Sequence, residues 1–173
     1  MRTILVTGGA GFIGSHLSER LLKEGNRVLV IDNFNNYYDP AIKRNNVEEV
    51  KKTCIENNIS LDNYKVFEGD IRDNEFLKEV FSNKIDSIMH LAACAGVRPS
   101  IEDPSLYYDV NITGTVNLLE RCRENNIKQF VFASSSSVYG NNEKVPFAES
   151  DRVDNPISPY AATKKSGELL CHT

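Results

Sequence analysis

Three glycines spaced three residues apart, Gly8, Gly11 and Gly14, constrain the fold of this chain more than any other feature. They follow a short apolar run, Arg2–Thr7, and precede a segment with helical spacing of apolar residues, Phe12–Lys23. Glycine permits a tight turn and a close approach of backbone amides to a pyrophosphate. The start of the following helix offers free N–H groups and partial positive charge. A glycine loop between a strand and a helix therefore predicts a dinucleotide phosphate site.

An acidic residue follows at the position that such a site needs. Asp32 closes the second predicted strand, Arg27–Ile31, and lies 18 residues after Gly14. A carboxylate at this point accepts a hydrogen bond from a ribose 2′-hydroxyl and repels a 2′-phosphate. We therefore predict that NAD is preferred to NADP. The alternative interpretation is a surface turn that happens to hold an aspartate.

Strands and helices alternate along the rest of the chain. Further strands are predicted at 64–68, 86–91 and 129–133, and further helices at 74–81, 104–124 and from Tyr160 onward. The polar segment 33–63 is interpreted as a loop and a surface helix, and 140–159 as a loop. Alternation of this kind predicts an α/β fold, a Rossmann-type doubly wound parallel sheet with helices on both faces. Residues 1–173 are expected to form one NAD-binding domain.

Composition narrows the classes of partner. The net charge of −4 argues against a nucleic-acid binder, and no apolar run reaches the roughly 18 residues that span a bilayer. No secretory signal is recognisable, so we expect a cytoplasmic protein. The cysteines (Cys54, Cys94, Cys122 and Cys171) and the three histidines lack zinc-site spacing, so we expect free thiols and no metal site.

Six segments in a fixed order resemble a known family. They are Thr7–Gly14, Gly69–Ile71, His90–Ala93, Tyr108–Thr115, Ser134–Gly140 and Ser158–Lys164. Together they resemble the extended short-chain dehydrogenase/reductases, in particular the NAD-dependent nucleotide-sugar epimerases and dehydratases. Segments Ala95–Ser100, Ser134–Ser137 and Asn155–Tyr160 are most similar to those of UDP-glucuronate 4-epimerases. Members of this family run for about as many residues again, so we expect the chain to be the amino-terminal half of an enzyme, lacking the last strands and the substrate domain.

The resemblance implies a set of cofactor contacts. Asp70 and Ile71 would contact the adenine, residues 91–93 would form a backbone wall, and Asn111 would be structural and near the cofactor. The full implied set is Gly8, Gly11, Phe12, Ile13, Gly14, Asp32, Asn33, Asp70, Ile71, Leu91, Ala92, Ala93, Asn111, Ser134, Tyr160 and Lys164.

Tyr160 and Lys164 carry the predicted acid–base chemistry. At positions i and i+4 they share one face of a helix. A free tyrosine has a pKa of about 10, too high for a base at neutral pH, and a nearby ammonium favours the phenolate. Lys164 is therefore predicted to activate Tyr160. The resemblance makes Ser135 the third catalytic residue, because a hydroxyl can hold the reacting sugar hydroxyl beside Tyr160.

The predicted substrate is a UDP-sugar bound by Arg98, Ser135, Ser136, Ser137 and Tyr160. Relatives that dehydrate or decarboxylate the sugar commonly carry acids in the serine segment, so Ser136 and Ser137 favour an epimerase. The resemblance implies that Tyr160 removes the proton from the sugar O4 while hydride passes from C4 to NAD and back, through a 4-keto sugar. It also implies a homodimer for the full-length enzyme and no turnover by the chain alone.

Several alternatives stay open at this point. UDP-galactose 4-epimerases also lack acids in the serine segment, so UDP-glucose and UDP-galactose remain candidate substrates. A dehydratase or decarboxylase of the same fold is disfavoured. The third alternative is a non-catalytic NAD-binding module, and such modules often lose the tyrosine and lysine that this chain keeps. Plain loop serines and a solvated arginine are the alternatives for Ser136, Ser137 and Arg98.

Overall fold

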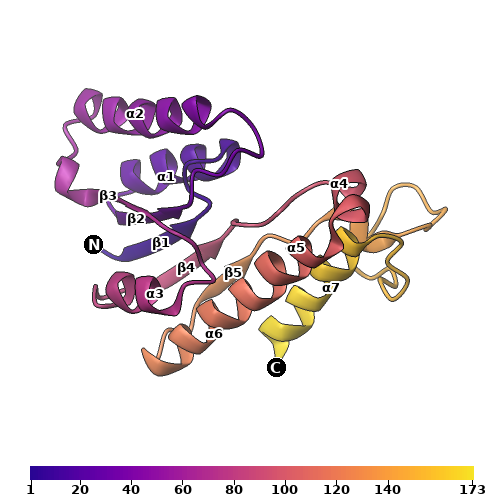
Figure 1. Cartoon of the computed structure of the whole chain (residues 1–173). Helices are drawn as coiled ribbons and strands as arrows, with labels where there is room; N and C mark the ends of the chain where they lie inside the picture. Colours follow the sequence, from indigo (N-terminus) through magenta and orange to yellow (C-terminus); the bar gives the residue numbers. More distant parts are fainter.

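Five parallel strands form the centre of the molecule. The computed structural model describes all of residues 1–173. The strands are β1 (Thr3–Thr7), β2 (Arg27–Asp32), β3 (Tyr64–Glu68), β4 (Ser87–His90) and β5 (Phe130–Phe132). Their order in the sheet is β3-β2-β1-β4-β5, and every neighbouring pair runs parallel (Figure 1). The predicted Rossmann-type sheet is therefore confirmed.

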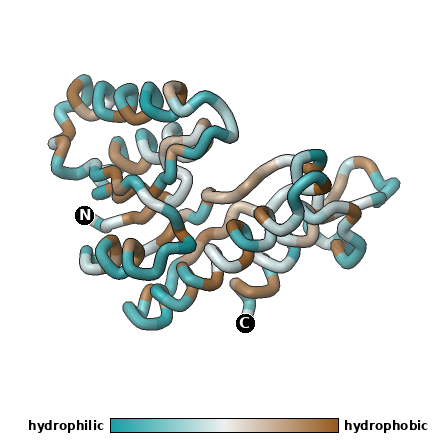
Figure 2. Tube along the Cα trace, in the orientation of Figure 1, coloured by the Kyte–Doolittle hydropathy of each residue, from teal (hydrophilic) through white to brown (hydrophobic).

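Helices cover both faces of the sheet because strand residues alternate between two cores. On one face Ile4 and Val6 pack with α1 (Phe12–Lys23) and α2 (Pro40–Glu56). On the other face Leu5 packs with residues of α3 (Asn74–Phe81) and α6 (Gly114–Glu124). Figure 1 shows α1 and α2 on one side of the strands and α3 and α6 on the other. The strands are mostly hydrophobic in Figure 2, whereas α2 is mostly hydrophilic, as expected for a surface helix.

The segment 104–124 differs from the prediction of one continuous α-helix. It consists of α5 (Pro104–Tyr108), a π-helical turn (Asp109–Thr113) and α6. A π-turn inserts one extra residue and re-aims the side chains near it. Here it accompanies Asn111, whose buried side chain binds the backbone of Cys94. The turn coincides with a contact between residues 17 apart in the sequence, which the periodicity of apolar residues does not report.

The remaining elements are short or lie after β5. They are α4 (Val97–Glu102), 3-10 turns at Leu61–Asn63 and Ser136–Tyr139, and α7 (Pro159–His172). The hydroxyl of Ser158 caps α7, and Pro159 occupies its first turn, where a missing N–H costs nothing. No helix in the structure is both long and apolar enough to cross a membrane.

The topology leaves an opening where the strand order reverses. From β1 the chain builds outward to β2 and β3, then returns to place β4 on the other side of β1. Loops leaving the carboxyl ends of β1 and β4 therefore diverge over opposite faces. In doubly wound sheets this divergence is where ligands bind.

Candidate active site

A cleft of about 410 Å³ lies at this switch point. Its walls come from the loops after the strands and from the first turns of α1 and α7. Most of the predicted cofactor residues line it: Gly8, Gly11, Phe12, Ile13, Gly14, Asp32, Asn33, Asp70, Ile71, Leu91, Ala92, Ala93, Ser134, Tyr160 and Lys164. The fold thus brings residues from six separate segments to one place.

The glycine loop is packed so tightly that side chains are excluded. Gly8 has a φ of +69°, and a Cβ there would lie 2.8 Å from the backbone nitrogen of Ala92. A Cβ on Gly14 would lie 2.3 Å from the carbonyl oxygen of Gly8. The loop therefore lets α1 start directly against the end of β1. No side chain caps this helix, and its first turn holds no acid, so its free N–H groups are available to an anion.

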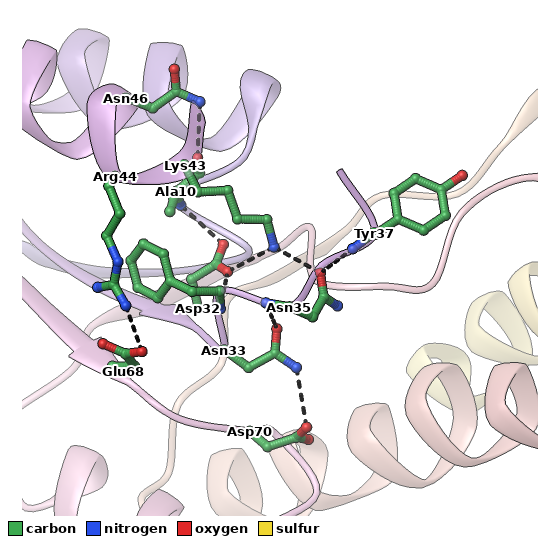
Figure 3. A network of polar contacts seen from close by, with 11 residues as sticks. Ala10, Asp32, Asn33, Asn35, Tyr37, Lys43, Arg44, Asn46, Glu68 and Asp70 are labelled. Atoms are coloured by element: carbon green, nitrogen blue, oxygen red, sulfur yellow. Dashed lines mark hydrogen bonds and ion pairs between the residues drawn. The ribbon is translucent and has the colours of Figure 1, made fainter. Parts of the chain in front are cut away.

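Asp32 is buried and held by three donors. The backbone N–H of Phe34 and the Lys43 ammonium both donate to its Oδ1, at 2.9 and 3.1 Å. The N–H of Ala10 donates to its Oδ2 at 3.2 Å. Figure 3 shows the Lys43 side chain reaching from α2 to Asp32 and to Asn35, whose Oδ1 accepts a bond of 3.0 Å.

This arrangement limits what Asp32 and Lys43 can offer to a ligand. Each carboxylate oxygen accepts about two hydrogen bonds and an ammonium donates three. Oδ1 of Asp32 is saturated, whereas Oδ2 keeps one acceptor position. Lys43 keeps one donor after binding Asp32 and Asn35. A hydroxyl group, which both donates and accepts, matches this pair.

Asp70 lies at the next position around the cleft and is fixed by an arginine. Arg72 binds both carboxylate oxygens, at 3.0 and 2.8 Å, and its other nitrogen binds Asp109 of the π-turn. Hydrogen bonds from Arg72 lower the pKa of Asp70 to about 2, so the group stays ionised at neutral pH. Asn33 also donates to Asp70, at 3.2 Å (Figure 3). The ribose side and the adenine side of the predicted site are therefore linked.

Tyr160 and Lys164 meet at the opposite end of the cleft. The Lys164 ammonium lies 6.0 Å from the centre of the Tyr160 ring and donates to the carbonyl of Ala133 at 2.9 Å. Burial lowers the pKa of Lys164 to about 8. Tyr107 packs edge-to-face on Tyr160, with ring centres 6.2 Å apart, and its hydroxyl donates to the carbonyl of Ala95. Both rings are thereby fixed in orientation.

Other predicted residues do not line the cleft. Ser135 caps the 3-10 turn: its hydroxyl accepts the N–H of Ser137 and donates to that residue's hydroxyl. Ser136 and Arg98 are exposed, the latter on α4. The Asn111 side chain is buried behind the wall, where it binds Cys94 and Thr163. The Asn111 amide is thus held by the backbone of Cys94 and by Thr163, and the expectation that Asn111 is structural and near the cofactor stays a prediction.

Ten residues that line the cleft are absent from the predicted set, and four of them lie together in one polar segment. Asn35, Tyr37, Tyr38 and Lys43 come from the polar segment after β2, which has no clear periodicity. The pair Asp39–Pro40 was a usable signal, because an N-cap residue followed by proline marks a helix start. It places Lys43 in the first turns of α2, above the end of β2. No group of three or more His, Cys, Asp or Glu side chains with metal-binding geometry occurs in the structure.

Comparison with known proteins gives consistent matches. The family described as GDP-mannose 4,6 dehydratase matches residues 5–173. Arabidopsis thaliana UDP-glucuronate 4-epimerase 3 is 50% identical over 173 residues, which are 99% of this chain and 38% of that protein. UDP-glucuronate 4-epimerase of Thermodesulfobacterium geofontis is 48% identical over 170 residues, 98% of this chain and 50% of that protein.

Solved structures of UDP-sugar 4-epimerases also match the chain. UDP-glucose 4-epimerase from Bifidobacterium longum, in complex with NAD⁺ and UDP, superposes with a TM-score of 0.86 at 33% identity, covering 98% of this chain and 48% of that one. A mutant UDP-glucuronic acid 4-epimerase from Bacillus cereus, with a fluorinated UDP-glucuronic acid and NAD, gives 0.84 at 38% identity, covering 98% and 51%. The chain thus spans about half the length of these relatives, or less.

Proposed function

The chain belongs to the family described as GDP-mannose 4,6 dehydratase, and from that membership we propose that it binds NAD and supplies catalytic groups for the 4-epimerisation of a UDP-sugar. The observation that carries the proposal is the cleft in which the glycine loop, Asp32 and the Tyr160–Lys164 pair converge. Relatives named as UDP-sugar 4-epimerases share this half of their sequence.

The cleft fits NAD at both ends. The free N–H groups at the start of α1, beside a loop whose glycines carry no side chains, suit a pyrophosphate. The free acceptor on Asp32 suits a ribose hydroxyl, and its charge opposes a 2′-phosphate. Leu91 and Ala92 form an apolar wall that leads toward Tyr160, where the nicotinamide end would lie.

Tyr160 and Lys164 are proposed to move the proton of the reacting sugar. Bound NAD supplies a reversible hydride acceptor for C4 of the sugar. Tyr160 removes the proton from O4 as the 4-keto sugar forms and returns it at the end, so no net oxidation occurs. Lys164, held at the carbonyl of Ala133, stabilises the phenolate beside it. We propose that the Ser135 hydroxyl leaves the 3-10 cap to hold the sugar O4.

UDP-glucuronate is the substrate that we propose first. The relatives with the identities given above act on it by name, and the serine segment carries no acid. In this proposal Ser136, Ser137 and the exposed Arg98 would bind the sugar carboxylate. UDP-glucose is the second candidate, because epimerases of that name superpose on the chain with similar TM-scores.

A chimera tests the activity. Residues 1–173 are fused to the part of the T. geofontis epimerase that lies beyond the matched half, and product is measured by chromatography. We expect UDP-galacturonate from UDP-glucuronate, faster than UDP-galactose from UDP-glucose. Tyr160→Phe should remove turnover while NAD stays bound, whereas Tyr108→Phe, at an exposed neighbouring tyrosine, should change little. The 173-residue chain alone is expected to bind NAD without turnover, because it spans half of these relatives.

Three results would contradict the proposal. A folded chimera that binds NAD but yields no epimer would exclude the catalytic assignment. A faster reaction with UDP-glucose would exclude the proposed substrate. Turnover by Tyr160→Phe near the unmodified rate would exclude Tyr160 as the base.

A further inference from the structure

A buried histidine directly precedes the cleft residues Leu91–Ala93 and does not itself line the cleft. His90 ends β4, is only 1% exposed and packs against the rings of Phe130 and Phe132. Its Nδ1 lies 2.6 Å from the hydroxyl of Thr7, and its Nε2 lies 3.0 Å from the hydroxyl of Thr115. Both threonines are fully buried. The proposed acid–base chemistry assigns no role to this side chain.

The neighbours of His90 fix which nitrogen carries its proton. A threonine hydroxyl has one hydrogen to donate. Thr115 donates its hydrogen to the carbonyl of Asn111, at 2.6 Å, so its oxygen must accept from His90 Nε2. In a neutral ring Nδ1 is then bare and accepts from Thr7, whose oxygen accepts the N–H of Ala92 at 3.2 Å. Every donor in this series meets an acceptor.

A charged imidazole is excluded by the surroundings. Burial, and second the nearby Lys164 ammonium, lower the pKa of His90 to about 3. A doubly protonated ring would also present a donor to Thr7 and turn the Thr7 hydrogen away from it. The neutral Nε2–H form is therefore the one that satisfies the whole series.

The series continues from Asn111 to the helix that carries the proposed catalytic pair. The Asn111 amide donates to the Thr163 hydroxyl at 3.0 Å, and Thr163 donates to the carbonyl of Tyr160 at 2.8 Å. Asn111 and Thr163 are also buried. Hydrogen bonds of side chains from β1, β4, the π-turn, α6 and α7 thus link Ala92 to Tyr160.

We propose that His90, as the neutral Nε2–H tautomer, is a positioning residue that sets the wall Leu91–Ala93 against the Tyr160 turn of α7. Chains of buried hydrogen bonds reinforce one another and hold one arrangement. The proposal rests on the proposed function in one respect, namely that Ala92 and Tyr160 face bound NAD. His90 acts through its partners and touches neither cofactor nor substrate.

The first experiment reads the tautomer directly. Nitrogen-15 NMR of the imidazole rings in the 173-residue chain should show hydrogen on Nε2 of His90 and none on Nδ1, with exposed His16 and His172 as internal references. Thr115→Val removes the acceptor, so the hydrogen should move to Nδ1. Thr115→Ser keeps the hydroxyl and should keep the original tautomer. An Nδ1–H or doubly protonated His90 in the unmodified chain, or no change in Thr115→Val, overturns the proposal.

The second experiment asks whether the series positions the cofactor site. Thr115→Val should weaken NAD binding about tenfold, and Thr115→Ser should restore it. Thr53→Val is the matched control, because it removes a threonine hydrogen bond, to Glu19, far from the cleft. It should lower stability and leave the Kd for NAD unchanged. Unchanged affinity in Thr115→Val, measured well below its unfolding temperature, overturns the positioning role.

The two experiments separate this proposal from the function on which it rests. If the unmodified chain binds no NAD, the proposed function is contradicted. The NMR measurement of the His90 tautomer then still tests the directions of the hydrogen bonds in the series. If the chain binds NAD more tightly than NADP, but Thr115→Val leaves the Kd for NAD unchanged, the proposed function stands and the positioning role of His90 is excluded.

Discussion

At Asp32 a single carboxylate is shared between the protein and the proposed ligand. Lys43 and two backbone amides already use three of its acceptor positions. The remaining position accepts one hydroxyl, and a 2′-phosphate placed there would meet the negative charge. The neighbouring Lys43 ammonium offsets part of this repulsion. The predicted preference is therefore a balance between the two charges.

Asp32→Ala should shift that balance. We expect the unmodified chain to bind NAD more tightly than NADP. In the variant, the ratio of the Kd for NADP to the Kd for NAD should fall by about tenfold or more, which corresponds to about 1.4 kcal/mol. With the carboxylate gone, the Lys43 ammonium is free for the 2′-phosphate. Paired calorimetric titrations with both cofactors measure the ratio. Asp154→Asn, at an exposed aspartate, is the control, and equal affinities in the unmodified chain would refute the assignment.

Lys164 makes stability depend on pH. Burial lowers its folded pKa to about 8 from an ordinary 10.5, so the unfolded chain binds more protons between these values. Stability contributed by this group therefore rises with pH through that window. At pH values below this window, burial of the charged ammonium lowers the free energy of unfolding by on the order of 3 kcal/mol.

Lys164→Met removes this dependence. The free energy of unfolding of the variant minus that of the unmodified chain should fall as the pH rises from 8 to 10.5. Loss of the bond to Ala133 shifts the difference equally at every pH and leaves its slope unchanged. Denaturant titrations at several pH values give the slope. A difference that stays constant would show that the ammonium is not desolvated.

At the scale of elements, the contact between α1 and the end of β1 forms the phosphate end of the cleft. Gly14 allows it, because any side chain would collide with the backbone of Gly8 and Gly9. Gly25, at the end of the same helix, has a φ of +80° and open space around it. The two glycines therefore serve different purposes, one for packing and one for backbone conformation.

Alanine at each position should separate the two effects. Gly14→Ala should push α1 from the loop and weaken NAD binding by more than tenfold. Gly25→Ala should cost about 1 kcal/mol of stability through backbone strain and leave the Kd unchanged. Calorimetry and thermal unfolding measure both quantities in each variant. If both variants bound NAD as the unmodified chain does, the loop would not be the phosphate site.

Elements with strong local signals were predictable from sequence. The glycine loop, α1, α3 and the alternating strands follow from the spacing of glycines and apolar residues. The π-turn was not predictable, because it coincides with a contact between Asn111 and Cys94 that the spacing of apolar residues does not report. Lys43 was missed for a similar reason: its partner Asp32 lies on another element, and a polar segment carries no periodic signal.

At the scale of the whole molecule, the loops after β1 and β4 diverge where the strand order of the sheet reverses. We propose that the cleft between these loops carries an NAD site, assembled from segments that span residues 8 to 164. Asp32 pairs with Lys43 at one end of the cleft, and at the other end we propose that His90 with its threonines positions the wall. These groups are in place in the 173-residue chain, so it should bind the cofactor.

Titration of the 173-residue chain with NAD by isothermal calorimetry tests this claim most directly. We predict saturable binding with one NAD per chain, tighter than NADP. Binding should weaken in Gly14→Ala and persist in Tyr160→Phe, because the latter removes a hydroxyl and keeps the ring. A folded chain that shows no saturable heat with NAD would contradict this claim. Equal Kd values for NAD in the Gly14→Ala variant and in the unmodified chain would contradict it as well.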